Sequence, residues 1–405
     1  MTMLARDLPL PADWDRSGLP AWTYHSVALL ELEKRKLFRT HWQLAGHVSD
    51  VPAAGDFFTV DIADDRALVA RGDDGVVRAF HNLCRHRGSR VTAERRGHCQ
   101  RAFVCPFHGW TYNLDGTLRG AAQPQSFGAL DRSKYGLKPI GLEIWMGFIF
   151  IRFENGPQPA VAQLMAHFAE ELACYRLEAV VPAGAPSETV LPVNWKSVRD
   201  VDNEGYHVAM AHPALQDLYG ATYFDQPYVN GVSRSEGRYA TNRGRLWSVR
   251  AYVGLSSGPL WLAEDKRRLW SYFGLFPNAV LAVTPESVQF YQEFPLAVDR
   301  TLIRGAVYRR PDETRSDRLA RYLAQRIDRE TYKEDIQLSV WSNESMKSCG
   351  FDGFHLSDLE RGVRSHHDHL RAVLPVMRLE KQPKETEVAA LNEKMLQPAG
   401  AHTVT

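Results

Sequence analysis

The organisation of this chain is indicated first by the stretch Phe80-His81-Asn82-Leu83-Cys84-Arg85-His86-Arg87-Gly88. A second stretch follows it, Val104-Cys105-Pro106-Phe107-His108-Gly109-Trp110. Each stretch carries one cysteine and one histidine, spaced as Cys-x-His in the first and Cys-x-x-His in the second, which is a spacing typical of metal ligands. The two stretches together therefore offer two thiolates and two imidazoles. The pattern therefore predicts one metal site, formed by Cys84, His86, Cys105 and His108.

The ligand types leave two kinds of metal site open. Two thiolates and two imidazoles suit either a tetrahedral zinc ion or a [2Fe-2S] cluster in which two histidines replace two cysteines on one iron. A zinc finger usually opens with two closely spaced cysteines on one turn. Here each loop carries one ligand of each type, which lets the cysteines hold one iron and the histidines the other. The spacing favours the cluster, and a zinc module is the alternative.

Both stretches resemble the cluster-binding box of the Rieske non-haem iron oxygenases, and the chain is similar to the large (alpha) subunit of the aromatic ring-hydroxylating oxygenase superfamily. The similarity extends to Thr111-Tyr112 and Asp115-Gly116. It implies a [2Fe-2S] Rieske cluster on the four ligands named above. It also implies an α+β fold, with a small antiparallel β Rieske domain and a helix-grip catalytic domain whose curved antiparallel sheet carries helices on one face.

The composition is that of a globular protein. A chain of 405 residues exceeds one ordinary core, and 44% hydrophobic residues are enough for large cores. Because 49 basic residues balance 48 acidic ones, we expect neither nucleic acid nor a membrane as a partner. No signal peptide or apolar span of ~20 residues is recognisable. Five cysteines, an odd number, favour a reducing compartment, so the expected location is cytoplasmic.

Four segments are expected along the chain. They are an N-terminal helical segment over 1–42 that packs on the catalytic domain, the Rieske domain over 43–155, the catalytic mononuclear iron domain over 156–380 and a mobile tail over 381–405. Helical spacing of apolar residues predicts helices over 26–42, 161–175, 317–342 and 357–373. Alternation predicts strands over 57–62, 67–71, 76–81, 142–145, 148–153, 188–193, 269–276, 279–284, 288–294 and 302–308.

A second group of candidate ligands lies in the expected catalytic domain. Glu204 and His207, three residues apart, are expected on one helical face. His212 precedes Pro213, which disfavours helix, so His212 is expected where the helix ends or bulges. Two histidines with a distant carboxylate form the facial triad of non-haem Fe(II) oxygenases, although a histidine pair on an amphipathic helix is more often structural.

The resemblance assigns His207 and His212 as ligands of a mononuclear Fe(II). It places the third ligand in a C-terminal helix at a Glu-Asp step, which Lys333-Glu334-Asp335-Ile336 matches at Asp335. Glu334 and Glu344 are the alternatives on the same expected helix.

The resemblance also gives Glu204 a role in catalysis. The matching acid in the family joins a cluster histidine, here His108, to an iron histidine, here His207, across a subunit boundary. A carboxylate that accepts hydrogen bonds from both imidazoles fixes their tautomers and tunes both metals. The alternative is an ordinary glutamate on a helix surface. The expected assembly is a homotrimer, possibly with a small beta subunit.

The sequence therefore predicts a terminal oxygenase component that uses O2 on a small organic substrate, by aromatic hydroxylation or dihydroxylation. No dinucleotide-binding Gly-x-Gly-x-x-Gly motif follows a strand, so we expect NAD(P)H to be used by a separate reductase. That reductase or a ferredoxin then donates electrons to this chain. Asp200-Val201-Asp202 departs from the commoner family pattern, and Glu204 with His212-Pro213 resembles the homotrimeric branch that oxidises quaternary-ammonium compounds. A monooxygenase or demethylase of a betaine-like substrate is thus one alternative, and an iron-sulfur electron carrier without oxygenase activity is another.

Two sets of side chains are candidates for the substrate pocket. Aromatic residues could line an arene pocket or a cage for a methylated ammonium. They are Trp247, Tyr252, Trp261, Trp270, Tyr272, Phe273, Phe290 and Tyr291. Three arginines, Arg243, Arg245 and Arg250, could hold a carboxylate.

Overall fold

The computed structural model describes residues 14–240 and 244–397. The chain forms two compact units. The smaller unit consists of Phe38–Ala166 and Arg176–Pro182, and the larger unit consists of the described parts of Met1–Leu37, His167–Tyr175 and Ala183–Thr405. No helix within the described residues is long and apolar enough to cross a membrane.

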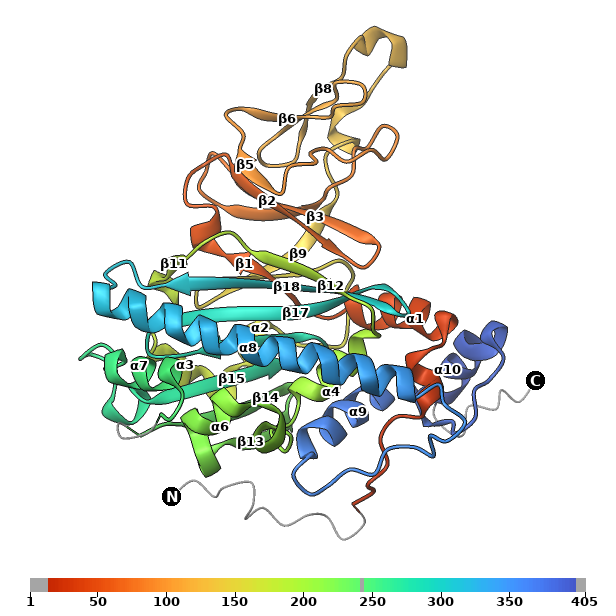
Figure 1. Cartoon of the computed structure of the whole chain (residues 1–405). Coiled ribbons are helices and arrows are strands. Elements are labelled where there is room, and N and C mark those ends of the chain that lie inside the picture. The colour runs from red at the N-terminus through yellow and green to blue at the C-terminus, as the bar shows by residue number, and fades with distance from the viewer. Residues whose placement is uncertain (1–13, 241–243, 398–405) are drawn as a thin grey trace. The chain divides into compact units, whose positions relative to one another are not determined.

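The smaller unit is built on antiparallel strands. One sheet has the order β1-β10-β9-β4-β3-β2-β5, and β6, β7 and β8 form a second, three-stranded sheet (Figure 1). The turn between β3 and β4 contains Gly75, whose φ is +78°. The bounds are β1 Gln43–His47, β2 Asp56–Ile62, β3 Asp65–Arg71, β4 Val77–His81, β5 Arg96–His98, β6 Ala102–Val104, β7 Thr111–Asn113, β8 Leu118–Gly120, β9 Pro139–Trp145 and β10 Phe148–Arg152, with the short helix α2 at Val161–Leu164.

The larger unit is an antiparallel sheet with helices packed on it. Consecutive pairings run β12-β18-β17-β16-β15-β14-β13. The strands are β12 Ser187–Leu191, β13 Phe224–Val229, β14 Val232–Arg238, β15 Leu269–Leu275, β16 Ala279–Val283, β17 Ser287–Ala297 and β18 Arg300–Arg309. The helices are α1 Val27–Glu33, α3 Ala169–Ala173, α4 Trp195–Asp202, α5 Val208–Ala211, α6 Pro213–Tyr219, α7 Trp247–Leu255, α8 Arg315–Ser345, α9 Arg361–Val373 and α10 Val388–Leu396. The predicted α+β fold class is confirmed.

Helix α8 carries Asp335, one of the three expected iron ligands. It begins with a capping box, in which Thr314 accepts from the backbone N–H of Asp317 and Asp317 accepts from the backbone N–H of Thr314. Its buried side chains Ala320, Leu323 and Ile327 recur at helical spacing and belong to one core cluster with residues of α6 and α7. The helix therefore lies fixed across the sheet, as Figure 1 shows.

Several elements differ from the sequence prediction. The helix expected over 26–42 starts with Ser26 as its N-cap, but α1 ends at Glu33, a π-helical turn follows to Phe38, and β1 starts at Gln43. The helix expected over 161–175 is interrupted because Phe168 has φ −110° and ψ 3°. Within the expected mobile tail, 388–396 forms α10, which contacts α1 and buries Val388 and Asn392. Residues 398–405 of that tail lie outside the described part of the chain.

Candidate metal centres

The two cluster loops of the smaller unit have the same backbone structure. The N–H of Gly88 donates to the carbonyl oxygen of Cys84 at 3.0 Å, and the N–H of Gly109 donates to that of Cys105 at 3.0 Å. Both glycines have positive φ, +75° and +69°, which a residue with a Cβ rarely adopts. The two Cys-to-Gly segments are therefore matched backbone turns, in which His86 stands two residues after Cys84 and His108 three residues after Cys105.

The four predicted cluster ligands come together on these turns. Cys84 and Cys105 are both buried, and the rings of His86 and His108 lie with their centroids 4.6 Å apart. Nδ1 of His86 is buried and has no hydrogen-bond partner among the described residues, and the ring stacks on Trp110. A buried imidazole nitrogen normally finds a partner, so an unpaired one beside two cysteines fits a metal ligand. These residues fit a [2Fe-2S] cluster.

Tyr112 on β7 contacts the cluster loop directly. Its hydroxyl oxygen accepts from the N–H of Arg85 at 2.9 Å and lies 3.2 Å from Sγ of Cys84. Because the oxygen is already an acceptor, its own hydrogen is free to point at the sulfur. Tyr112 is therefore a hydrogen-bond donor to one cluster ligand, and the sequence reasoning did not identify it.

In the larger unit, the predicted shared helix of Glu204 and His207 is wrong. Helix α4 ends at Asp202, and the chain runs without helix to His207, where α5 begins. Gly205 lies so close to Tyr223 that a Cβ at this position would be 1.9 Å from the Tyr223 ring. The link is therefore held by tertiary contacts that the sequence pattern does not contain. His212 lies between α5 and α6, as expected from Pro213.

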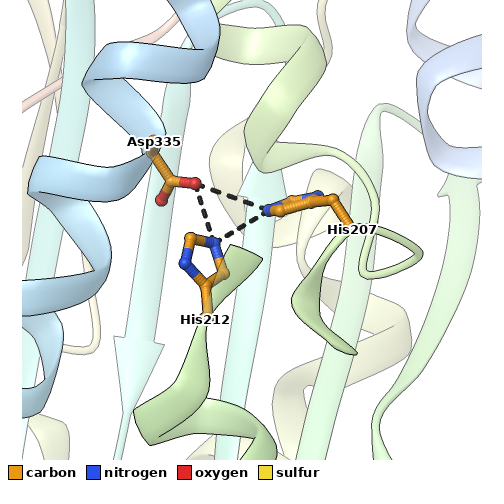
Figure 2. Close-up of side chains that lie close together, drawn as sticks. All are labelled: His207, His212 and Asp335. Carbon is orange, nitrogen blue, oxygen red and sulfur yellow. Dashed lines mark hydrogen bonds and ion pairs between the residues drawn. The ribbon is translucent and has the colours of Figure 1, made fainter. Parts of the chain in front are cut away.

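Three predicted iron ligands converge despite that break. Nε2 of His207 lies 2.9 Å from Nε2 of His212, and Oδ1 of Asp335 lies 2.8 Å from Nε2 of His212 and 3.4 Å from Nε2 of His207. Figure 2 shows the three side chains pointing at one another from α8 and from the two ends of α5. Among the described residues they form a group of atoms able to hold one metal ion.

The outer nitrogens of the two imidazoles are bonded to carboxylates. Nδ1 of His207 contacts Glu204, and Nδ1 of His212 lies 2.8 Å from Oε2 of Glu334. An ionised carboxylate only accepts, so each Nδ1 carries a hydrogen and each Nε2 presents a lone pair. Two nitrogen lone pairs and one carboxylate oxygen then face a single point, which requires a cation. The donor set of two histidines and one carboxylate fits Fe(II).

Without a metal, this concentration of negative charge favours protonated histidine. Burial lowers the pKa of His207, but hydrogen bonds to Asp335 and Glu204 outweigh burial and raise that pKa to about 10. Burial raises the pKa of Asp335, but hydrogen bonds from His207 and His212 bring it below its ordinary value. A proton and a metal ion therefore compete for the same site.

The three acids considered as the third iron ligand differ in their position relative to the two histidines. Asp335 faces both Nε2 atoms, and Glu334 faces the outer nitrogen of His212. Glu344 is exposed and lies nine residues further along α8, about 13 Å along the helix axis. The structure therefore separates a candidate ligand, Asp335, from a residue that orients a ligand, Glu334.

A cavity of about 300 Å³ adjoins the three candidate iron ligands. Tyr272, Phe290 and Tyr291 line it, but the other five aromatic residues considered from the sequence do not. Neither Arg245 nor Arg250 lines it, and Arg243 lies outside the described residues. Val201, at the departure from the commoner family pattern, is part of the lining.

A buried charge group supports one wall of this cavity. Arg199 on α4 bonds to Asp202 and lies 3.1 Å from Glu293 on β17. The hydroxyl of Tyr291 donates to the other oxygen of Asp202. Sequence reasoning missed this group, although the i, i+3 spacing of Arg199 and Asp202 was a signal. It fixes α4, and hence the start of the Glu204–His207 link, to the sheet.

Comparisons with known proteins match both parts of the chain to described domains. Residues 41–134 match the Rieske [2Fe-2S] domain, and residues 173–375 match the ring hydroxylating alpha subunit (catalytic domain). The glycine betaine monooxygenase oxygenase subunit of Chromohalobacter salexigens is 39% identical over 214 residues, 52% of this chain and 47% of that protein. The carnitine monooxygenase oxygenase subunit of Escherichia coli strain K12 is 28% identical over 363 residues, 87% of this chain and 92% of that protein.

A solved structure gives the same result for the fold. It is that of a quaternary ammonium Rieske monooxygenase, described for carnitine oxidation and inter-subunit electron transfer, with a TM-score of 0.75 and 25% identity over 90% of this chain and 98% of that one. The match to the glycine betaine relatives spans about half of their length. These matches do not support two of the alternatives left open by the sequence, a zinc module and an electron carrier without oxygenase activity. The chain belongs to the ring hydroxylating alpha subunits, the large subunits of Rieske non-haem iron oxygenases, whose cofactors are a [2Fe-2S] cluster and a mononuclear iron.

Proposed function

We propose that this chain is the oxygenase component of a quaternary-ammonium monooxygenase, which oxidises a carbon atom bonded to a cationic nitrogen. The observation that carries the proposal is the charge of the cavity beside the iron ligands. Among the described residues that line it, Arg329 is the one arginine or lysine, and it is exposed. The acids that line it are Asp202, Glu204, Glu293, Asp328 and Asp335. Arg199 contacts Asp202 and Glu293, and the iron histidines contact Glu204 and Asp335. Asp328 is therefore the lining acid without an ion-pair partner among the described residues, and its carboxylate favours a cationic substrate.

Aromatic faces in the same cavity suit a methylated ammonium group. Tyr223, Tyr272, Phe290 and Tyr291 all line it. A quaternary ammonium cannot donate hydrogen bonds, so aromatic rings and nearby carboxylates are the groups that recognise it. The names of the glycine betaine and carnitine relatives support the same substrate class.

Aromatic hydroxylation, the first expectation from the sequence, is less well supported. A flat hydrocarbon is best bound by walls that are mostly apolar. The lining of this cavity is itself mostly apolar, so the choice between the two substrate classes rests on Asp328 within the lining and on the glycine betaine and carnitine relatives. The quaternary-ammonium alternative therefore replaces it as the proposed function.

The roles of individual residues follow from their contacts. His207, His212 and Asp335 hold an Fe(II) ion, which when bound activates O2 with electrons from the Rieske cluster. Glu204 and Glu334 hold hydrogens on the outer nitrogens of the two histidines. The second oxygen of Glu204 also accepts from the backbone N–H of His207, at 3.1 Å, which fixes the carboxylate at that position.

The proposed electron path involves another subunit. Glu204 of one subunit joins His207 to His108 of a neighbouring cluster, in a homotrimer that receives electrons from a separate reductase or ferredoxin. The solved relative described for inter-subunit electron transfer supports this arrangement.

A single turnover tests the proposed function. Protein loaded with iron and chemically reduced in advance is mixed with O2 and a panel of trimethylammonium compounds and aromatic acids, and products are identified by mass. Pre-reduction removes the need for the reductase. We expect formaldehyde or trimethylamine from the trimethylammonium compounds and no change in the aromatic acids. An oxygenated arene as the main product contradicts the proposal.

A further inference from the structure

The cavity contains a second carboxylate on helix α8, well away from the iron ligands. Asp328 precedes Asp335 by seven residues, and both line the same cavity. Seven residues are close to two helical turns, so both side chains lie on one face of α8, about 10 Å apart along its axis. A substrate with its reacting methyl group at the iron ligands therefore extends its other end toward Asp328.

Asp328 is held in place by a neutral partner. Its Oδ2 accepts from Nε2 of Gln289 on β17 at 3.0 Å. No lysine, arginine or histidine of the described chain lies within 4.0 Å of its carboxylate oxygens. Burial raises its pKa to about 6, and the hydrogen bond from Gln289 and the charge of Arg329 oppose this rise only in part. Asp328 is therefore positioned by Gln289 while its charge is available to a ligand.

Few groups around Asp328 could bind the carboxylate of a substrate. Arg329 is adjacent in sequence, but it is exposed and its guanidinium lies over the ring of Tyr322, 5.8 Å from the ring centroid. Tyr272, which also lines the cavity, has its hydroxyl paired with that of Tyr219 at 2.9 Å. A second carboxylate brought to this end of the cavity therefore meets a like charge.

We propose that Asp328 receives the end of the substrate that is remote from the iron, and that this end carries a hydroxyl or amino donor and not a carboxylate. This inference rests on the proposed function and narrows it to quaternary-ammonium compounds whose second polar group is a hydrogen-bond donor. It separates this chain from a strict glycine betaine oxygenase, because the far end of glycine betaine is a carboxylate.

Choline and glycine betaine form a matched pair of probes. Both carry a trimethylammonium group on a two-carbon arm, and they differ in the terminal group, a hydroxyl or a carboxylate. Binding to iron-loaded protein is measured by calorimetry without O2, and formaldehyde is measured in single turnovers. We expect the wild type to bind choline about tenfold more tightly than glycine betaine, and Asp328→Asn to remove or reverse that preference, mainly by a gain for glycine betaine.

Two further variants keep the test decisive. Glu330→Gln changes an acid on the same helix that pairs with Arg326 at 2.8 Å and does not line the cavity, so it keeps the wild-type preference. Arg329→Gln tests the competing arrangement in which that arginine binds a carboxylate. The proposal is overturned if Asp328→Asn, folded and with full iron, leaves the preference unchanged, or if the wild type prefers glycine betaine and Arg329→Gln abolishes its binding.

These outcomes also separate the inference from the proposed function. If trimethylammonium compounds are oxidised but glycine betaine is preferred, the proposed role of Asp328 is wrong and the proposed function still holds. If no trimethylammonium compound is bound or oxidised while an arene is, both the proposed function and this inference fall.

Discussion

Nδ1 of His212 lies 2.8 Å from Oε2 of Glu334, the residue next to Asp335 on helix α8. Two consecutive acids thus act on one histidine, Asp335 at its metal-facing nitrogen and Glu334 at its outer nitrogen. Removing the charge at Glu334 weakens the orientation and basicity of the imidazole, so Glu334→Gln is expected to lower Fe(II) affinity about tenfold or more. Competition with an iron chelator measures the change.

The same helix provides a control for Glu334→Gln. Glu344 is exposed and distant from both histidines, so Glu344→Gln keeps the wild-type affinity. Asp335→Ala removes a proposed ligand and is expected to leave only the cluster irons, about two per chain instead of about three. Equal affinities in the wild type and Glu334→Gln would show that this contact does not support the metal.

Glu204→Gln tests the proposed electron path. The amide keeps the size of the side chain but cannot accept from two imidazoles as a carboxylate does. We expect both metal sites to stay occupied, while oxidation of the reduced cluster by O2 in the presence of substrate slows by about 100-fold or more. Stopped-flow absorbance of the cluster follows that step. Product formation at the wild-type rate would rule out a bridging role for Glu204.

Iron uptake is expected to depend on pH with a defined sign. His207 in the metal-free site has its pKa raised to about 10, so the site is protonated at neutral pH and must lose a proton when the metal binds. Affinity for Fe(II) therefore rises with pH, by up to about tenfold per unit, until the pH passes that pKa. Titration calorimetry in buffers of different ionisation enthalpy counts the protons released. An affinity that is constant between pH 6.5 and 8.5 contradicts this proton competition.

Local spacing explains which parts of the site were predictable. Cys84 and His86, like Cys105 and His108, are two or three residues apart, so the loop that carries them is visible in the sequence. Contacts between α8 and the rest of the unit cannot be seen in the sequence, because the partners are far apart in the chain. Asp328 and its partner Gln289 are 39 residues apart, and the direction of the Asp328 side chain depends on how the helix is rotated against the sheet. Only the family resemblance could select Asp335.

The missed hairpin of β13 and β14 has a different cause. Arg234 lies within β14 and would be expected to face solvent, but it is buried and held by Glu171 and Glu236. Pro227 within β13 further obscures the strand pattern. Strands whose inward positions are charged give no alternation of apolar and polar residues, so periodicity cannot detect them.

Tyr112→Phe is expected to lower the reduction potential of the cluster. The tyrosine hydroxyl is 3.2 Å from Sγ of Cys84, and a hydrogen bond to that sulfur favours the more negative, reduced cluster. Loss of the bond lowers the potential by about 50 mV, the equivalent of roughly 1 kcal/mol for one electron. A redox titration followed by electron paramagnetic resonance measures it. Tyr135→Phe, which alters a ring packed on Trp110, is the control and leaves the potential unchanged.

A buried ion pair between α1 and α4 is expected to stabilise the larger unit. Nζ of Lys196 lies 2.5 Å from Oε1 of Glu33, and Nε1 of Trp195 donates to Oε2 of the same carboxylate at 2.8 Å. Both charged side chains are fully buried, so Glu33→Ala leaves an ammonium without a partner and lowers the free energy of unfolding by about 3–5 kcal/mol.

Glu31, two residues earlier on the same helix, is the matched control for that loss. It is exposed and pairs with Lys34 at 2.8 Å, so Glu31→Ala costs less than about 1 kcal/mol. Urea denaturation of the two variants gives both values. Because α4 leads directly to the Glu204–His207 link, we also expect Glu33→Ala to lose mononuclear iron before cluster iron on heating. Similar stabilities of the two variants would mean that the attraction within the pair only offsets its desolvation, and that packing of the hydrocarbon parts holds α1 against α4.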